Sequence, residues 1–129
     1  MSTYHGPSDT KVLEHLLNPR NVGDLPNADG VGEVGAVSCG DVLRIGIRVR
    51  DGRITEARFR TFGCGTAIAC SSVTTELLVG RTIEEALKFS NEEVSRALGG
   101  LPPAKAHCPV LAEEAVKAAL EDYLRRGKA

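Results

Sequence analysis

Residues 42–62 read VLRIGIRVRDGRITEARFRTF, and this stretch decides the fold. From Val42 to Arg50 apolar and polar residues alternate, which is the pattern of a strand that buries one face. Asp51-Gly52 then supplies the two-residue turn of a tight hairpin, and residues 54–62 form its second strand. We therefore expect an antiparallel hairpin whose core face carries Leu43, Ile45, Ile47 and Val49.

The region before the hairpin predicts a short helix, a loop and one more strand. Residues 8–17 have apolar side chains at helical spacing, and this helix should stop at Asn18-Pro19. Residues 19–35 are rich in Gly, Asn, Asp and Pro, as a loop or an edge segment would be. A strand around residues 33–37 would complete a three-stranded antiparallel sheet.

The region after the hairpin predicts helices. Residues 66–79 are apolar enough for a buried helix that ends at Gly80, and Thr82 should cap a short one. Another helix starts at Asn91, and Pro109, at a first-turn position, begins the last helix. The fold class is therefore α+β, a three-stranded antiparallel sheet packed against C-terminal helices, with a short N-terminal helix. We expect a single domain over residues 1–129, with residues 1–7 flexible.

Composition excludes several classes of function. With 129 residues and a formal net charge of −1, the chain has no bulk attraction to nucleic acid or to anionic lipid. It has two Tyr, three Phe and no Trp, which leaves little for a base-stacking surface. No apolar run is long enough to span a membrane, and no signal peptide opens the chain. A soluble, cytoplasmic protein is expected.

Three of the four cysteines stand beside glycine or proline at predicted element junctions: Cys39, Cys64 and Cys108. Glycine neighbours let the backbone approach a ligand and expose the sulfur, whereas a structural cysteine usually packs inside an apolar run. Cys70, within a predicted helix, fits the structural description. Four cysteines are too few for a disulfide scaffold, so reduced, metal-binding thiols are the better interpretation.

Neighbouring residues extend this set of thiols. Cys64 comes just before a predicted helix and Cys108 occupies a predicted cap position, where the helix dipole favours the thiolate form. Asp41 and His107 add an oxygen and a nitrogen, so zinc or an iron–sulfur cluster would both fit. The spacing contains no C-x-x-C pair, and on spacing alone three reduced cysteines in turns remain the alternative.

Four motifs in order carry a resemblance to a known family. They are residues 18–23 (NPRNVG), residues 38–41 (SCGD), residues 61–69 (TFGCGTAIA) and residues 101–108 (LPPAKAHC). From about Val12 to Tyr123 the chain resembles the iron–sulfur cluster assembly scaffold family, which comprises IscU and the amino-terminal domain of NifU.

The resemblance implies a function and a site. Such a scaffold builds a [2Fe-2S] cluster from iron and from persulfide sulfur that a cysteine desulfurase delivers, and passes it to apo-proteins. By resemblance Cys39, Cys64 and Cys108 are the thiolate ligands, with either Asp41 or His107 as the fourth, and Cys108 is the candidate persulfide acceptor. A non-thiolate ligand would keep the cluster releasable.

The same resemblance implies the protein's partners and cargo. An electron donor such as a ferredoxin would take part, and no turnover chemistry of the chain's own is expected. The resting site could hold zinc, the [2Fe-2S] cluster could be converted to [4Fe-4S], and chains could associate around the cluster.

A chaperone-recognition segment of the family corresponds to Leu101, Pro102, Pro103, Ala104 and Lys105. It would bind an Hsp70-type chaperone as an extended peptide with an apolar anchor. Ala104 departs from the family's valine and weakens that anchor. A helix-breaking loop is the alternative interpretation of this segment.

Two other functions compete with the scaffold. A zinc-bearing, persulfide-accepting sulfurtransferase shares the fold, but such relatives typically have an insertion before the last ligand and lack the histidine that stands here as His107. A ferredoxin-like redox carrier would want four thiolates, and Cys70 is poorly placed to be the fourth.

Overall fold

The computed structural model describes residues 7–36, 40–63, 65–100 and 107–126. Three strands and five helices are present in these ranges. In chain order they are α1 (Pro7–Leu17), β1 (Gly30–Ala36), β2 (Asp41–Arg50), β3 (Arg53–Phe62), α2 (Gly65–Leu78), α3 (Ile83–Leu87), α4 (Asn91–Ala97) and α5 (His107–Arg125).

The predicted sheet and fold class are confirmed. The strands pair antiparallel in the order β1-β2-β3, and the β2–β3 hairpin turns at Asp51 and Gly52. Asp51 and Gly52 have φ angles of 52° and 75°, the left-handed geometry that a two-residue turn requires. Leu43, Ile45 and Ile47 are buried, as the alternation predicts, and Val49 packs against the core from a partly buried position.

Strand β1 begins at Gly30, three residues before the predicted strand and inside the predicted loop. Its glycines are the reason for the difference. A methyl group on Gly32 would overlap the main-chain oxygen of Ala115, and one on Gly30 would lie 2.9 Å from Tyr123 Cβ. These glycines therefore let the backbone of α5 lie directly on β1, so a composition typical of loops here serves close packing.

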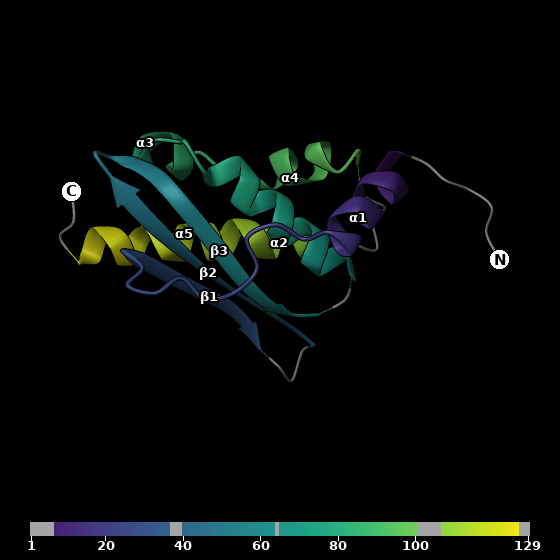
Figure 1. The fold of residues 1–129 in the computed structure, drawn as a ribbon, viewed down its shortest axis with the longest axis horizontal. Coiled ribbons are helices and arrows are strands. Elements are labelled where there is room, and N and C mark those ends of the chain that lie inside the picture. The colour runs from purple at the N-terminus through teal and green to yellow at the C-terminus, as the bar shows by residue number, and fades with distance from the viewer. Residues whose placement is uncertain (1–6, 37–39, 64, 101–106, 127–129) are drawn as a thin grey trace.

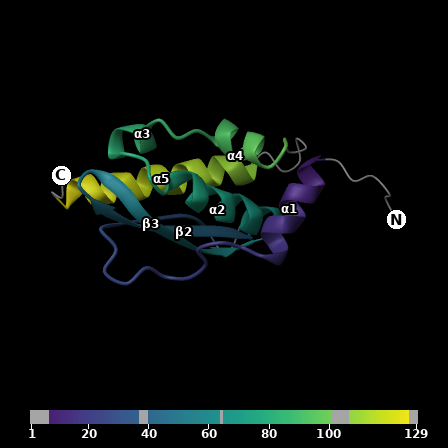
Figure 2. The same ribbon diagram turned by 45° about the horizontal axis from the view of Figure 1, so that its top comes forward.

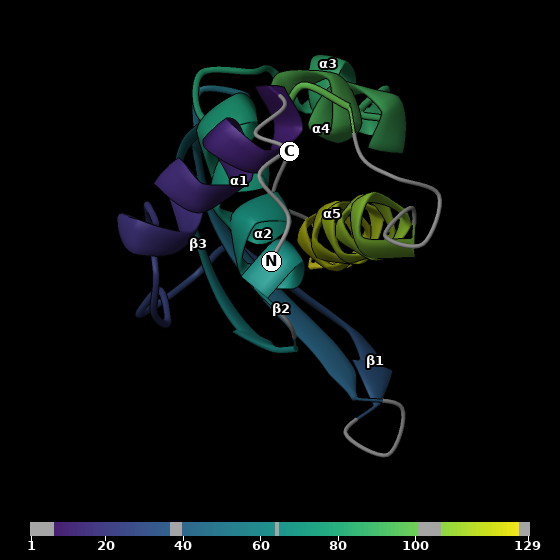
Figure 3. The same cartoon turned by 90° about the vertical axis from the view of Figure 1, so that its right-hand side faces the viewer.

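The helices are arranged in layers on one face of the sheet. Helices α2 and α5 cover this face, and α3 and α4 lie over them as a further layer (Figure 2). Helix α1 packs on α2 at one end of the molecule, and the last turn of α5 lies at the opposite end (Figure 1). The view along the molecule in Figure 3 shows α1 beside α2, with α5 below α4.

The segment between α1 and β1 contacts the edge of β3 and part of the outer face of the sheet. Phe59 N–H donates to Asn21 O at 2.9 Å and Gly23 N–H to Phe59 O at 2.7 Å, so the outer edge of β3 is bonded at Phe59. On the outer face, a methyl group on Gly46 would lie 3.3 Å from Leu25 Cβ. This segment therefore packs against the sheet in the structure.

The helix boundaries agree closely with the sequence. Thr82 caps α3 by accepting from Glu85 N–H at 3.1 Å, as expected. Helix α2 runs one residue earlier than predicted at each end. Helix α5 begins at His107, so Cys108 lies within its first turn and the predicted cap position is wrong. No helix in the described ranges is long and apolar enough to cross a membrane.

Candidate functional site

Asp41 and Cys108, two of the five predicted site residues, line the same hollow. Asp41 begins β2 and Cys108 lies in the first turn of α5, so residues far apart in sequence meet on one hollow. Cys108 is only 4% exposed, whereas Asp41 is partly exposed. The hollow thus has a buried sulfur and a carboxylate on its walls.

The other walls of the hollow come from the sheet and from two helices: Val42 and Leu43 of β2, Thr61 of β3, Ala67 and Ser71 of α2, and Leu111 of α5. Thr61 Oγ1 donates to Val42 O at 2.7 Å, and Ser71 Oγ donates to Ala67 O at 2.8 Å. Both hydroxyl groups are thereby bonded to main-chain oxygens, Thr61 across to β2 and Ser71 within α2, which leaves a mostly apolar wall. The hollow has a volume of about 10 Å³, close to the space of one water molecule.

Three predicted donors lie outside the part of the chain whose side chains the structure describes: Cys39, Cys64 and His107. So does the predicted chaperone segment, residues 101–105. Among the described residues, no three His, Cys, Asp or Glu side chains gather as a metal site. Cys39 stands two residues before Asp41, and Cys64 directly precedes the first residue of α2.

The two cysteines that the structure does describe occupy different surroundings. Cys70 is 1% exposed and belongs to the hydrophobic core on α2, as predicted for a structural cysteine. Cys108 is also buried but lines the hollow beside Asp41. Neither of these two cysteines forms a disulfide.

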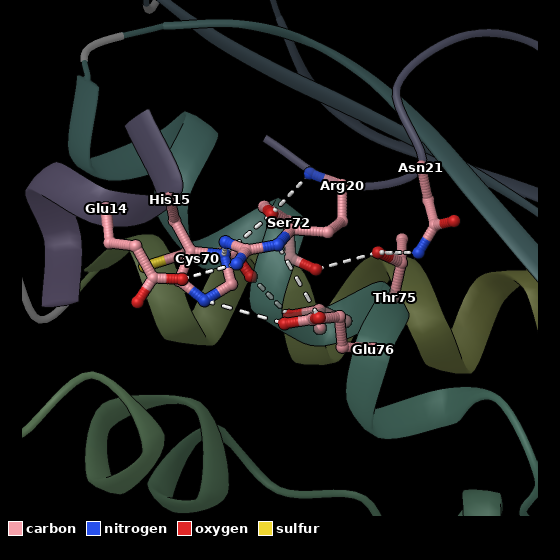
Figure 4. A network of polar contacts seen from close by, with 9 residues as sticks. Glu14, His15, Arg20, Asn21, Cys70, Ser72, Thr75 and Glu76 are labelled. Atoms are coloured by element: carbon pink, nitrogen blue, oxygen red, sulfur yellow. Dashed lines mark hydrogen bonds and ion pairs between the residues drawn. The ribbon is translucent and has the colours of Figure 1, made fainter. Parts of the chain in front are cut away.

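A polar network that the sequence analysis missed joins α1 to α2 (Figure 4). Ser72 Oγ accepts from Arg20 N–H at 2.9 Å and lies 2.7 Å from His15 Nδ1. Asn21 Nδ2 donates to Thr75 Oγ1 at 3.1 Å. The motif of residues 18–23 therefore docks on buried hydroxyls of α2, and the signal for it was the run of serine and threonine inside an otherwise apolar helix.

Charged groups complete this network. His15 Nε2 lies 3.5 Å from Glu76 Oε1, and the Arg20 guanidinium pairs with Glu14 and, at 3.7 Å, with Glu76. Burial lowers the pKa of His15 from its ordinary value of 6.5, and the nearby Arg20 charge acts in the same direction. Neutral His15 can then accept from Ser72 through Nδ1 and keep its proton on Nε2, facing Glu76.

Helix α1 also reaches the beginning of α2. A methyl group on Gly65 would lie 3.1 Å from Leu16 Cδ2, so Leu16 packs over the first residue of α2. That residue directly follows Cys64 in the chain. The network and this contact therefore both place α1 against α2, the helix that begins directly after Cys64.

Comparison with known proteins defines the class. The model of the NifU-like N-terminal domain family matches residues 8–129. The chain therefore belongs to this family, and the resemblance found in the four motifs is confirmed.

Individual relatives carry consistent names. The chain is 53% identical over 116 residues to iron–sulfur cluster assembly scaffold protein IscU 1 of Archaeoglobus fulgidus, covering 90% of this chain and 76% of that protein. It is also 53% identical over 117 residues to the scaffold protein IscU of Azotobacter vinelandii, covering 88% and 91% of the two chains. Iron sulfur cluster assembly protein 1 of Encephalitozoon cuniculi is 48% identical over 132 residues, with 99% and 94% covered.

Solved structures share the fold. A putative iron–sulfur cluster assembly scaffold protein for the SUF system from Fervidobacterium islandicum superposes with a TM-score of 0.71 at 20% identity, covering 85% of this chain and 93% of that one. A NifU-like protein (N-terminal) from Brucella abortus gives a TM-score of 0.55 at 24% identity, covering 88% and 82%.

Proposed function

We propose that this protein is a scaffold on which an iron–sulfur cluster is assembled and from which it is passed to apo-proteins. The observation that carries the proposal is the meeting of Asp41 and Cys108 on one hollow. Both residues belong to motifs shared with the scaffold family, and relatives at 48–53% identity are named as iron–sulfur cluster assembly proteins.

The proposed ligands of the cluster are Cys39, Cys64 and Cys108, with Asp41 or His107 as the fourth. Cysteine thiolates are the usual ligands of iron–sulfur clusters, and an oxygen or nitrogen ligand binds the cluster iron less tightly than a fourth thiolate would. Cys108 is the proposed acceptor of persulfide sulfur. The cargo we propose is a [2Fe-2S] cluster, open to conversion to [4Fe-4S], with zinc as an occupant of the resting site.

The proposed partners follow from this chemistry. Sulfur in the persulfide state has to come from a cysteine desulfurase, and an electron donor such as a ferredoxin has to reduce it to sulfide. The proposed recipients of the cluster are apo-proteins. An Hsp70-type chaperone at residues 101–105 and association of chains around the cluster belong to the same proposal, as does a single domain over residues 1–129.

The test is an anaerobic reconstitution followed by transfer. The protein is incubated with a cysteine desulfurase, cysteine, a reductant and ferrous iron, re-isolated, and mixed with an apo-ferredoxin. Iron and acid-labile sulfide should co-purify with the protein and then move to the ferredoxin. Persulfide or zinc without acid-labile sulfide would overturn the scaffold function and favour the zinc-bearing sulfurtransferase.

A further inference from the structure

Gly63 lies against the carboxylate of Asp41. A methyl group built on Gly63 would lie 2.6 Å from Asp41 Oδ1 and 3.1 Å from Ala67 Cβ. A carbon and an oxygen that are not bonded do not approach this closely, so the space beside Gly63 is already filled by the carboxylate. The residue directly before Cys64 therefore touches the acidic member of the proposed ligand set.

The backbone does not explain this glycine. Gly63 is not among the glycines with a positive φ, whereas Gly35 and Gly40 have φ angles of 90° and 83°. An alanine could therefore adopt the conformation of residue 63 without strain. Glycine at position 63 therefore provides space for the Asp41 carboxylate, and its conformational freedom is not needed there.

We propose that Gly63 is a positioning residue, whose missing side chain leaves the space for the carboxylate of Asp41, the residue that lines the same hollow as Cys108. Gly63→Ala then acts mainly on Asp41, because the atom that it meets first is the end of a side chain that can rotate. Ala67 Cβ, in the first turn of α2, is a second close neighbour of the new methyl group at 3.1 Å. The inference rests on the proposed scaffold function only for its consequence, the lifetime of the cluster.

The chain offers a matched control on the other side of Cys64. Gly65→Ala adds the same methyl group, also at a position without a positive φ, and meets Leu16 Cδ2 at 3.1 Å. Leu16 is 38% exposed and can move aside. Gly65→Ala therefore adds a methyl group to the same motif, residues 61–69, at a position where the atoms it meets belong to Leu16 and not to Asp41.

The first measurement uses the apoprotein. NMR couplings of the Asp41 β-protons report the rotamer about the Cα–Cβ bond in wild type, Gly63→Ala and Gly65→Ala. Gly63→Ala should change the Asp41 rotamer and Gly65→Ala should not. An unchanged Asp41 rotamer in a folded Gly63→Ala protein would overturn the proposal. This result does not depend on whether the protein binds a cluster.

The second measurement is a double-mutant cycle on the rate of cluster loss to a chelator. Gly63→Ala should slow the loss by about tenfold, the same change as expected for Asp41→Ala. In the Asp41→Ala background Gly63→Ala should have no further effect on the rate of cluster loss, because the carboxylate oxygen that the new methyl group would displace is absent. Additive effects would contradict the proposal. If wild type holds no cluster at all, the proposed function fails while the rotamer result still stands.

Discussion

Ser72 Oγ lies 2.7 Å from His15 Nδ1, and this contact joins the middle of α2 to the end of α1 across 57 residues of sequence. The same oxygen accepts from Arg20 N–H at 2.9 Å. One hydroxyl on a buried helix therefore holds both the N-terminal helix and the first family motif.

Ser72→Ala should lower the free energy of unfolding by about 1–3 kcal/mol, because it leaves the Arg20 N–H and His15 without their shared partner. Urea unfolding followed by circular dichroism measures the change. Ser71→Ala is the matched control, since Ser71 is equally buried but bonds only to Ala67 of its own helix. An equal decrease in the free energy of unfolding of both variants would show that the hydrogen bonds of Ser72 to α1 and Arg20 add no stability of their own.

His15 makes stability depend on pH in a defined window. Its pKa is lowered in the folded protein by burial, so the unfolded chain takes up a proton first as the pH falls. The contribution of His15 to the free energy of unfolding should be fully present above about pH 6.5. It should decrease as the pH drops from there towards the lowered pKa of His15. Glu14, Arg20 and Glu76 are the charged groups that face the ring.

The measurement is the free energy of unfolding of wild type and His15→Asn at several pH values from 7.5 down to 5. The other histidines are common to both proteins and cancel in the difference. The gap between the two curves should shrink as the pH falls. Parallel curves would mean that His15 does not carry the effect.

Gly32→Ala should destabilise the protein by about 1–3 kcal/mol or more, because the added methyl group overlaps the backbone of α5, which cannot rotate away. Thermal unfolding measures the loss. Gly65→Ala is the control, since its methyl group meets only the end of a leucine side chain. A Gly32→Ala protein as stable as the control would contradict the direct contact of α5 with β1.

Asp41→Ala should slow cluster loss by about tenfold, equivalent to about 1.4 kcal/mol in the barrier, because the proposed exchangeable oxygen ligand is removed. The decay of the visible absorption of the holo-protein in the presence of a chelator gives the rate. Asp24→Ala is the control, as this exposed carboxylate pairs with Arg60 outside the hollow. Equal rates for wild type and Asp41→Ala would make His107 the better candidate for the fourth ligand.

The sheet was predictable because alternation along β2 and β3 and the Asp51-Gly52 turn are local features of the sequence. The start of β1 was not, since glycines in a loop and glycines under a helix look alike until the position of α5 is known. The role of Ser72 was hidden for the same reason: its partners, His15 and Arg20, lie more than 50 residues away. Local sequence patterns indicate helices and strands, whereas contacts between residues far apart in the sequence are seen only in the three-dimensional structure.

The candidate site was predicted from motifs and not from spacing. The structure brings Asp41 and Cys108 together, which the sequence separation could not have indicated. Gly63 belonged to a quoted motif but had no assigned role, because its importance depends on the position of the Asp41 oxygen.

The most direct test of the account compares Cys108 with Cys70, the two cysteines that the structure describes, both of which are buried. Iron and acid-labile sulfide per chain are measured after anaerobic reconstitution of wild type, Cys108→Ser and Cys70→Ser. Wild type and Cys70→Ser should carry equal amounts of both, and Cys108→Ser should carry little of either. A Cys108→Ser protein that carries as much cluster as wild type would contradict the central claim that this thiol holds the cargo.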